Sequence, residues 1–144
     1  MANMSLANLE KIGRLKTHVA TDDEIARLLA AAERNLRDAN AAGISDETRF
    51  DAAYKAIMPC ALAGLMAAGY RPSTAMPGHH QTMVQSLPLT LAVSTETMIV
   101  LDALRKKRNI NDYSGDLLDS ESLRICILEA KALHSLACSR LRRS

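Results

Sequence analysis

The segment 94–115, STETMIVLDALRKKRNINDYSG, decides the fold, because an amphipathic helix runs there into a polar and basic end. Ser94 and Thr95 are residues that start helices, and Glu96 favours the positive end of the helix dipole. Apolar residues then recur at helical spacing, namely Met98, Leu101, Ala103 and Leu104, and Ile99 and Val100 broaden this stripe. This pattern predicts a core helix, and any site is expected at its polar end.

The end of this helix is the main candidate for a site. It carries the polar residues Arg105, Lys106, Lys107, Arg108, Asn109, Asp112 and Tyr113. Each helical residue turns about 100 degrees from the last, so four consecutive cations cover all sides and at least one must face the bundle. A guanidinium there needs acceptors, and Asn109 and Asp112 are the nearest to Arg108 in sequence. Either these cations cover a solvated helix end, or the mixed donors and acceptors form a binding site.

The composition fits one helical domain of 144 residues. Apolar residues make up 48% of the chain but Phe, Tyr and Trp only 3%, and the dominance of Ala, Leu and Met favours helices over strands. A net charge of +2 is too small to indicate bulk binding to nucleic acid or membrane. Because no apolar run could span a bilayer and no signal-peptide core is present, we expect a cytoplasmic protein without membrane contact.

Helical periodicity extends over most of the chain. Four main helices are expected at 21–39, 45–69, 94–111 and 119–141, and shorter ones within 5–15 and 79–91. Thr21 and Glu24 have the spacing of a capping box, and Asp119 is the expected cap of the last helix. The segment 70–78, YRPSTAMPG, reads as a loop. Short loops favour antiparallel neighbours, so the sequence predicts an all-α, antiparallel up-and-down helical bundle with its core at about residues 22–141.

The pattern at 45–69 predicts the central helix. Its apolar stripe is wide, and the periodicity resumes directly after Pro59, so a kink rather than an end is expected there. Small residues such as Ala61 and Gly64 would let a neighbouring helix approach closely.

Several chemistries lack their sequence patterns. His79 and His80 are adjacent and diverge on a helix, so they cannot chelate one metal, and HxxxH or ExxH spacing is absent. Glycine-rich phosphate loops and serine elbows are absent too. We therefore expect no metal and no cofactor. His79 and His80 either pack at a helix start or lie beside the Arg108 cluster.

The other chemically active side chains fit a packed interior. Cys60, Cys126 and Cys138 lie in apolar helical patterns, which indicates buried, reduced thiols. His134 lies among leucines and alanines and is expected to be packed, and Tyr54 is expected in the core or at its rim.

An all-helical bundle whose penultimate long helix ends in Arg108-Asn109, followed by Asp112 and Tyr113, resembles the HEPN (higher eukaryotes and prokaryotes nucleotide-binding) domains. The pieces GYRP at 69–72 and PGHH at 77–80 are also similar to some bacterial members. The resemblance covers about residues 22–141. It implies a HEPN-like fold, RNA or a nucleotide as ligand, and a homodimer, to which the small residues of the 45–69 helix would also contribute.

In that family, many members are metal-independent ribonucleases or toxins of toxin–antitoxin pairs. The active ones carry Arg, a polar residue, three variable residues and His. Arg108 and Asn109 match the first two positions, and Tyr113 takes the place of the His. A phenol, with an ordinary pKa of about 10, transfers protons poorly at neutral pH, so binding is expected to survive this replacement better than cleavage.

The resemblance implies a set of site residues. Arg108, Asn109 and Tyr113 would form the catalytic motif, and Arg105, Arg108, Asp112, His79 and His80 would contact RNA or nucleotide. The alternative is a non-catalytic interaction module that docks a partner protein, such as an antitoxin or a nucleotidyltransferase, through its helical faces.

Overall fold

The computed structural model describes residues 5–114 and 118–142, and the side chains of residues 111–114 lie outside this description. The chain is mostly helical, as predicted. Its elements, in order, are α1 (Leu6–Lys11), β1 (Leu15–Thr17), α2 (Asp22–Ala39), α3 (Asp46–Ala67), β2 (Tyr70–Pro72), α4 (His79–Gln85), α5 (Leu87–Thr90), α6 (Thr95–Ser114) and α7 (Ser120–Leu141).

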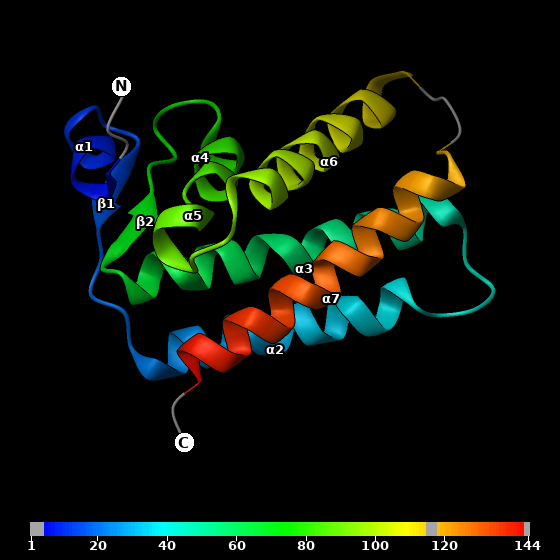
Figure 1. Ribbon diagram of the computed structural model, residues 1–144, viewed down its shortest axis with the longest axis horizontal. Helices are drawn as coiled ribbons and strands as arrows, with labels where there is room; N and C mark the ends of the chain where they lie inside the picture. The colour runs from blue at the N-terminus through cyan, green and yellow to red at the C-terminus, as the bar shows by residue number, and fades with distance from the viewer. Residues whose placement is uncertain (1–4, 115–117, 143–144) are drawn as a thin grey trace.

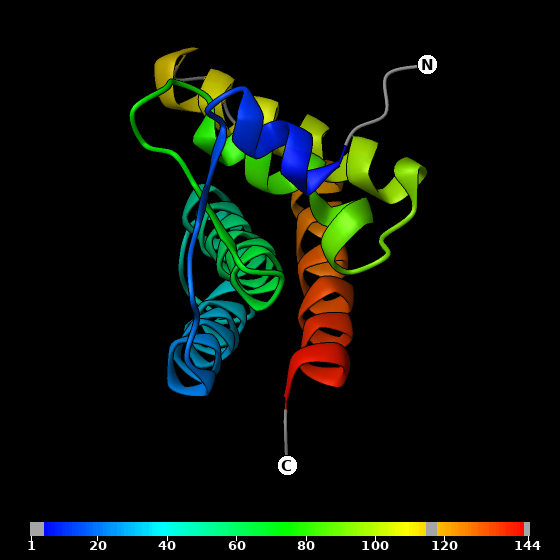
Figure 2. The same ribbon diagram turned by 90° about the vertical axis from the view of Figure 1, so that its left-hand side faces the viewer.

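The helices form a bundle of two layers (Figures 1 and 2). α2, α3 and α7 make the lower layer, where α3 packs against both α2 and α7. α1, α4, α5 and α6 lie above them, and α6 packs mainly against α4. The four long helices alternate in direction along the chain, as an up-and-down bundle requires, but α6 belongs to the second layer. The lower layer is thus a group of three helices.

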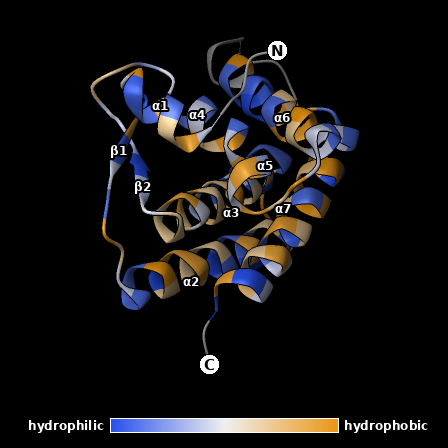
Figure 3. Ribbon diagram, turned by 60° about the vertical axis from the view of Figure 1, so that its left-hand side comes forward, coloured by the Kyte–Doolittle hydropathy of each residue, from blue (hydrophilic) through white to orange (hydrophobic). Residues whose placement is uncertain are grey.

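α3 is the central helix, as predicted. Twelve of its residues are buried, and they cover most of the helix except the face of Asp51, Lys55, Pro59, Leu62 and Met66, whereas α2 and α7 show hydrophobic and hydrophilic residues alternating around the helix (Figure 3). The helix continues without a break past Pro59 and ends before Gly69, whose φ of 94° is the left-handed conformation that glycine adopts readily.

The predicted helix starts are confirmed. Ser5, Thr21, Ser45, Ser94 and Asp119 each accept a hydrogen bond from the backbone N–H three residues later. At α2 the Glu24 side chain also reaches back to the Thr21 amide at 3.1 Å, which completes the capping box. Local sequence therefore places these helix starts correctly.

One departure from the prediction is a pair of short strands. They form a small antiparallel ribbon, in which Leu15 pairs with Pro72 and Thr17 with Tyr70, and the sequence predicted no strand in either place. The helical stretch after Gly78 divides at Ser86 into α4 and α5, and Pro88 lies in the first turn of α5, where proline is tolerated. None of the described helices combines the length and the apolarity that crossing a membrane requires.

The small residues of α3 serve packing within the chain. Ala61, Ala63 and Gly64 are buried, and a Cβ added to Gly64 would lie 3.0 Å from Thr90 Oγ1 and 3.1 Å from Leu91 Cγ. The close approach predicted for a neighbouring helix is therefore made by the α5 segment of the same chain. These residues give no support to a dimer, because no second copy can reach them.

We predict that Gly64→Leu lowers the free energy of unfolding by about 2 kcal/mol or more, since the added side chain has no room beside Thr90 and Leu91. Ala67→Leu, at an exposed position in the same helix, is the control and should change it by less than about 0.5 kcal/mol. Urea denaturation measures both. Equal effects of the two substitutions would contradict the packing described for Gly64.

Candidate functional site

Three helices bring polar side chains together where the start of α3 meets α4 and the second half of α6. Asp51 and Tyr54 come from α3, His79 and His80 from the first turn of α4, and Arg105 and Arg108 from α6. We call these six residues the three-helix cluster. The sequence predicted four of them, and the structure places those four around the α3 residues.

Arg108 is the centre of the cluster. Its Nε donates to Asp51 Oδ1 at 2.8 Å, and its Cζ lies 4.9 Å from the centre of the Tyr54 ring. The side chain is only 24% exposed, so one of the four consecutive cations faces the bundle, as predicted. A carboxylate on one side and an aromatic face on another fix the plane of the guanidinium.

Arg108 donates to Asp51, which lies 57 residues earlier in the chain and was not among the acceptors predicted from the sequence. Asn109 is exposed on α6. The predicted roles of Asp112 and Tyr113 fall on side chains outside the described residues. Spacing within one helix indicates only nearby acceptors, because contacts between helices depend on the whole fold.

His80 lies near this arginine, and His79 contacts His80 from the exposed first turn of α4. His80 Nδ1 and the Tyr54 hydroxyl share a hydrogen bond of 3.2 Å, and the His79 and His80 rings meet edge to face at 4.5 Å between centroids. Burial, together with the charges of His79, Arg108 and Arg105, lowers the pKa of His80. His80 is therefore neutral at pH 7.

Tyr54 is a core residue with a polar function. It is 2% exposed, and burial raises the pKa of its phenol to about 12 despite the opposing charge of Arg108. The phenol stays protonated at neutral pH. Its ring supports Arg108 while its hydroxyl holds His80, so one buried side chain positions both groups.

Carboxylates compensate the cations of α6. Asp102, which is 7% exposed, accepts from Arg105 at 2.8 Å and lies 3.6 Å from Lys106, and Lys107 pairs with Asp119 at 2.8 Å. Lys106 and Lys107 are 65% and 41% exposed, which fits the predicted solvated helix end. Arg105 and Arg108 lie inward, so the run of cations is divided between solvent and the cluster.

Asp51 is a carboxylate shared between two helices. Burial raises the pKa of its carboxyl, but hydrogen bonds from Arg108 and from Lys55, at 2.9 Å, outweigh this effect and lower the pKa below its ordinary value. Asp51 is thus ionised at neutral pH. It holds Arg108 in place and also reduces the positive potential of the cluster.

The cysteines and His134 behave largely as predicted. Cys60, Cys126 and Cys138 are free, and burial raises the pKa of both Cys60 and Cys126 to about 12, which makes them poor nucleophiles. Cys138 is only half-buried and lies 3.4 Å from His134 Nε2. His134 also contacts the Leu29 carbonyl at 3.2 Å, so it links α7 to α2.

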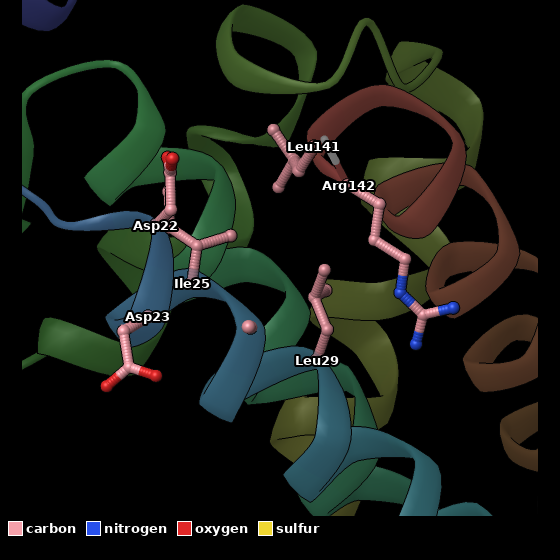
Figure 4. Close-up of a pocket in the computed structure, with 7 residues that line it drawn as sticks. Asp22, Asp23, Ile25, Leu29, Leu141 and Arg142 are labelled. Carbon is pink, nitrogen blue, oxygen red and sulfur yellow. The ribbon is translucent and has the colours of Figure 1, made fainter. Parts of the chain in front are cut away.

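A separate hollow of about 320 Å³ lies between the start of α2 and the end of α7 (Figure 4). Asp22 and Asp23 stand on one side of it, Arg142 on the other, and Ile25 and Leu141 contribute apolar walls. None of the predicted site residues lines this hollow. Its opposite charges give no net attraction for an anion, so it does not replace the three-helix cluster as the candidate site.

Within the described part of the chain, no three His, Cys, Asp or Glu side chains gather as metal ligands would. No family model matches this chain, and no curated protein matches it in sequence. The functional argument therefore rests on the cluster itself. Its groups can hold an anion and can exchange a proton through His80, both without a metal.

The sequence patterns did not predict Asp51 as a site residue or the polar function of Tyr54. A signal was available, because Asp51, Tyr54 and Lys55 stand at i, i+3 and i+4 in a helix that is apolar from Ala56 onward. Polar residues on one face of a buried helix mark a place where another polar element packs. What the pattern could not give is the identity of that element.

We predict that the protein becomes less stable as the pH falls, and that part of this loss arises from His80. Because its folded pKa lies below the ordinary value of about 6.5, the unfolded chain takes up the proton first as pH falls, and the free energy of unfolding decreases. Urea denaturation at pH 7.5 and 5.5 should show a smaller loss for His80→Gln than for the wild type. The same loss in both proteins would mean that His80 is not held in its neutral form.

Proposed function

We propose that this chain is a HEPN-like helical protein that binds the phosphate of RNA or of a nucleotide at the three-helix cluster. The observation that carries the proposal is the fixed guanidinium of Arg108, held by Asp51 and the Tyr54 ring beside His80. A planar, oriented guanidinium suits the paired oxygens of a phosphate better than a mobile ammonium does.

The neighbouring groups support the same ligand. Arg105 is close enough to affect the pKa values of both His80 and Tyr54, and the exposed Lys106 and Lys107 continue the cationic surface along α6. A second phosphate or the next nucleotide could contact these lysines. His79 is exposed at the helix start, where an imidazole face can stack on a base.

The carboxylates oppose binding and set its strength. Lys55 and the four cations of α6 pair with Asp51, Asp102 and Asp119, so a phosphate must compete with these carboxylates for the cations. We expect affinity to come from sharing Arg108 between Asp51 and phosphate. Such binding should weaken as salt concentration rises.

Arg108→Ala should abolish binding of a fluorescein-labelled single-stranded RNA, measured by fluorescence anisotropy. Arg108→Lys should restore it only in part, because an ammonium lacks the planar fork. Since Arg108 is half-buried and contacts Asp51 and Tyr54, the alanine variant should also lose about 1–2 kcal/mol of stability, more than an exposed helix-end residue would. Circular dichroism should show that it remains helical.

Arg27→Ala is the matched control for this experiment. Arg27 is 70% exposed on α2, pairs with Asp23 at 2.7 Å, and lies in the other layer, so its removal changes net charge equally without touching the cluster. RNA binding should be unchanged apart from a small general effect. Competition with ATP then distinguishes a nucleotide site from one that needs a polymer. Equal binding by Arg108→Ala and wild type would refute the proposal.

Ribonuclease activity is a further prediction, and it rests on the family resemblance. We expect the wild type to cleave total RNA slowly or not at all in the presence of a chelator, and Tyr113→His to raise cleavage by restoring the group at the family's His position. Adding Arg108→Ala to Tyr113→His should remove that gain. Cleavage that persists in the double variant would arise outside the proposed site.

Docking of a partner protein, such as an antitoxin or nucleotidyltransferase, is the second candidate function. It is favoured by the outer face of α6, where Ile99, Val100 and Ile110 are 58%, 37% and 61% exposed. If wild type binds neither RNA nor nucleotide, this reading takes precedence over the first.

A further inference from the structure

The two arginines of the three-helix cluster lie inward rather than on an open surface. The side chains of Arg105 and Arg108 are 13% and 24% exposed, whereas that of Lys106 is 65% exposed. An internal phosphate of a nucleic acid carries a nucleoside on each side, so it is best bound on an open surface. A terminal phosphate projects from one end of its ligand and can reach recessed groups. The exposure of the arginines therefore favours a terminal phosphate.

An ionised carboxylate is already bonded to each of these arginines, and a ligand must compete with it. Arg108 Nε donates to Asp51 Oδ1 at 2.8 Å. Arg105 Nε donates to Asp102 Oδ1 at the same distance. A phosphodiester has one negative charge on two free oxygens, as a carboxylate does, so it gains little by displacing one. A phosphomonoester has a charge of about −1.5 to −2 at pH 7 and three free oxygens, which gives it the advantage over a carboxylate.

His80 supplies a further donor beside the two arginines. Its Nδ1 lies 3.2 Å from the Tyr54 hydroxyl. Because the Tyr54 phenol stays protonated at neutral pH, its hydroxyl can donate to Nδ1, and neutral His80 then carries its own proton on Nε2. The charges of both arginines act on His80, so this N–H lies near their guanidiniums. The cluster thus offers one donor group for each free oxygen of a monoester.

We propose that the three-helix cluster selects a phosphomonoester, the terminal phosphate of an RNA end or of a mononucleotide, over an internal phosphodiester. This proposal rests on the phosphate binding proposed above and adds which phosphate is bound. Arg105, Arg108 and His80 each bind one oxygen of the terminal phosphate. The rest of the ligand stays outside the cluster, near the exposed lysines of α6.

The first test compares AMP with 3′,5′-cyclic AMP, which share base and ribose but carry a monoester and a diester. Isothermal titration calorimetry of the wild type should give an affinity for AMP at least about tenfold higher. The RNA arm uses unlabelled oligomers of one sequence with a phosphate at the 5′ end, at the 3′ end or at neither, as competitors of a labelled RNA. A preference in the AMP pair alone assigns the site to mononucleotides, and one in both arms extends it to RNA ends.

Neighbouring residues on α6 give a matched pair of variants for the second test. Arg105→Gln and Lys106→Gln each remove one positive charge, but only Arg105 lies inward. Arg105→Gln should bring the ratio of AMP to cyclic AMP affinity towards one, because it removes a donor that only the third oxygen uses. Lys106→Gln should weaken both ligands alike and leave the ratio unchanged. A fold defect would also weaken both ligands alike, so the ratio separates selection from stability.

Two results would overturn the proposal. One is a wild type that shows no preference for the monoester in either arm, and the other is a ratio that Arg105→Gln leaves unchanged. RNA binding that requires Arg108 but shows no such preference would leave the proposed phosphate site standing. A wild type that binds none of these ligands would remove the proposed function as well.

Discussion

Burial of most of α3 determines where the rest of the structure can place polar chemistry. Because α2 and α7 flank this helix and the upper layer covers it, its turns from Ala56 onward are apolar or small, and Tyr54 and Lys55 are the last residues before them that carry a polar group. Asp51, Tyr54 and Lys55 all lie in the first three turns. The three-helix cluster lies at this end of α3 because the charged half of α6 packs there.

Helix starts could be predicted from the sequence because a cap is decided within four residues. Ser45, for example, accepts from the Thr48 amide, and nothing distant is needed to make that bond. The ribbon of β1 and β2 could not be predicted in this way. Leu15 and Pro72 pair across more than fifty residues, and each strand has only three, too few to show an alternating pattern. Its existence depends on α2 and α3 returning the chain to the same edge.

The site was predictable to the same limited extent. Residue types and the charge run marked Arg108, and the turn residues before α4 placed His79 and His80 at a helix start, but no pattern within one helix could show that these groups meet. Asp51 lies 57 residues from the arginine it holds. The layer arrangement, with α6 crossing above α3, supplies that contact, and the layer arrangement is a property of the whole fold.

The ion pairs made by the cations of α6 bear on function in two opposite ways. They neutralise charge, so a phosphate meets a weaker potential than four adjacent cations would create. They also fix side chains before a ligand arrives, and ordering a long side chain on binding costs about 0.5–1.5 kcal/mol.

For the exposed Lys106 the first effect dominates, because its pair with Asp102 is long and orders it little. For Arg108 the second effect dominates, since the short bond to Asp51 and the contact with Tyr54 hold the guanidinium in one plane. A ligand whose binding requires an oriented, planar guanidinium will therefore depend on Arg108. A ligand attracted only by positive charge will not distinguish Arg108 from the neighbouring cations.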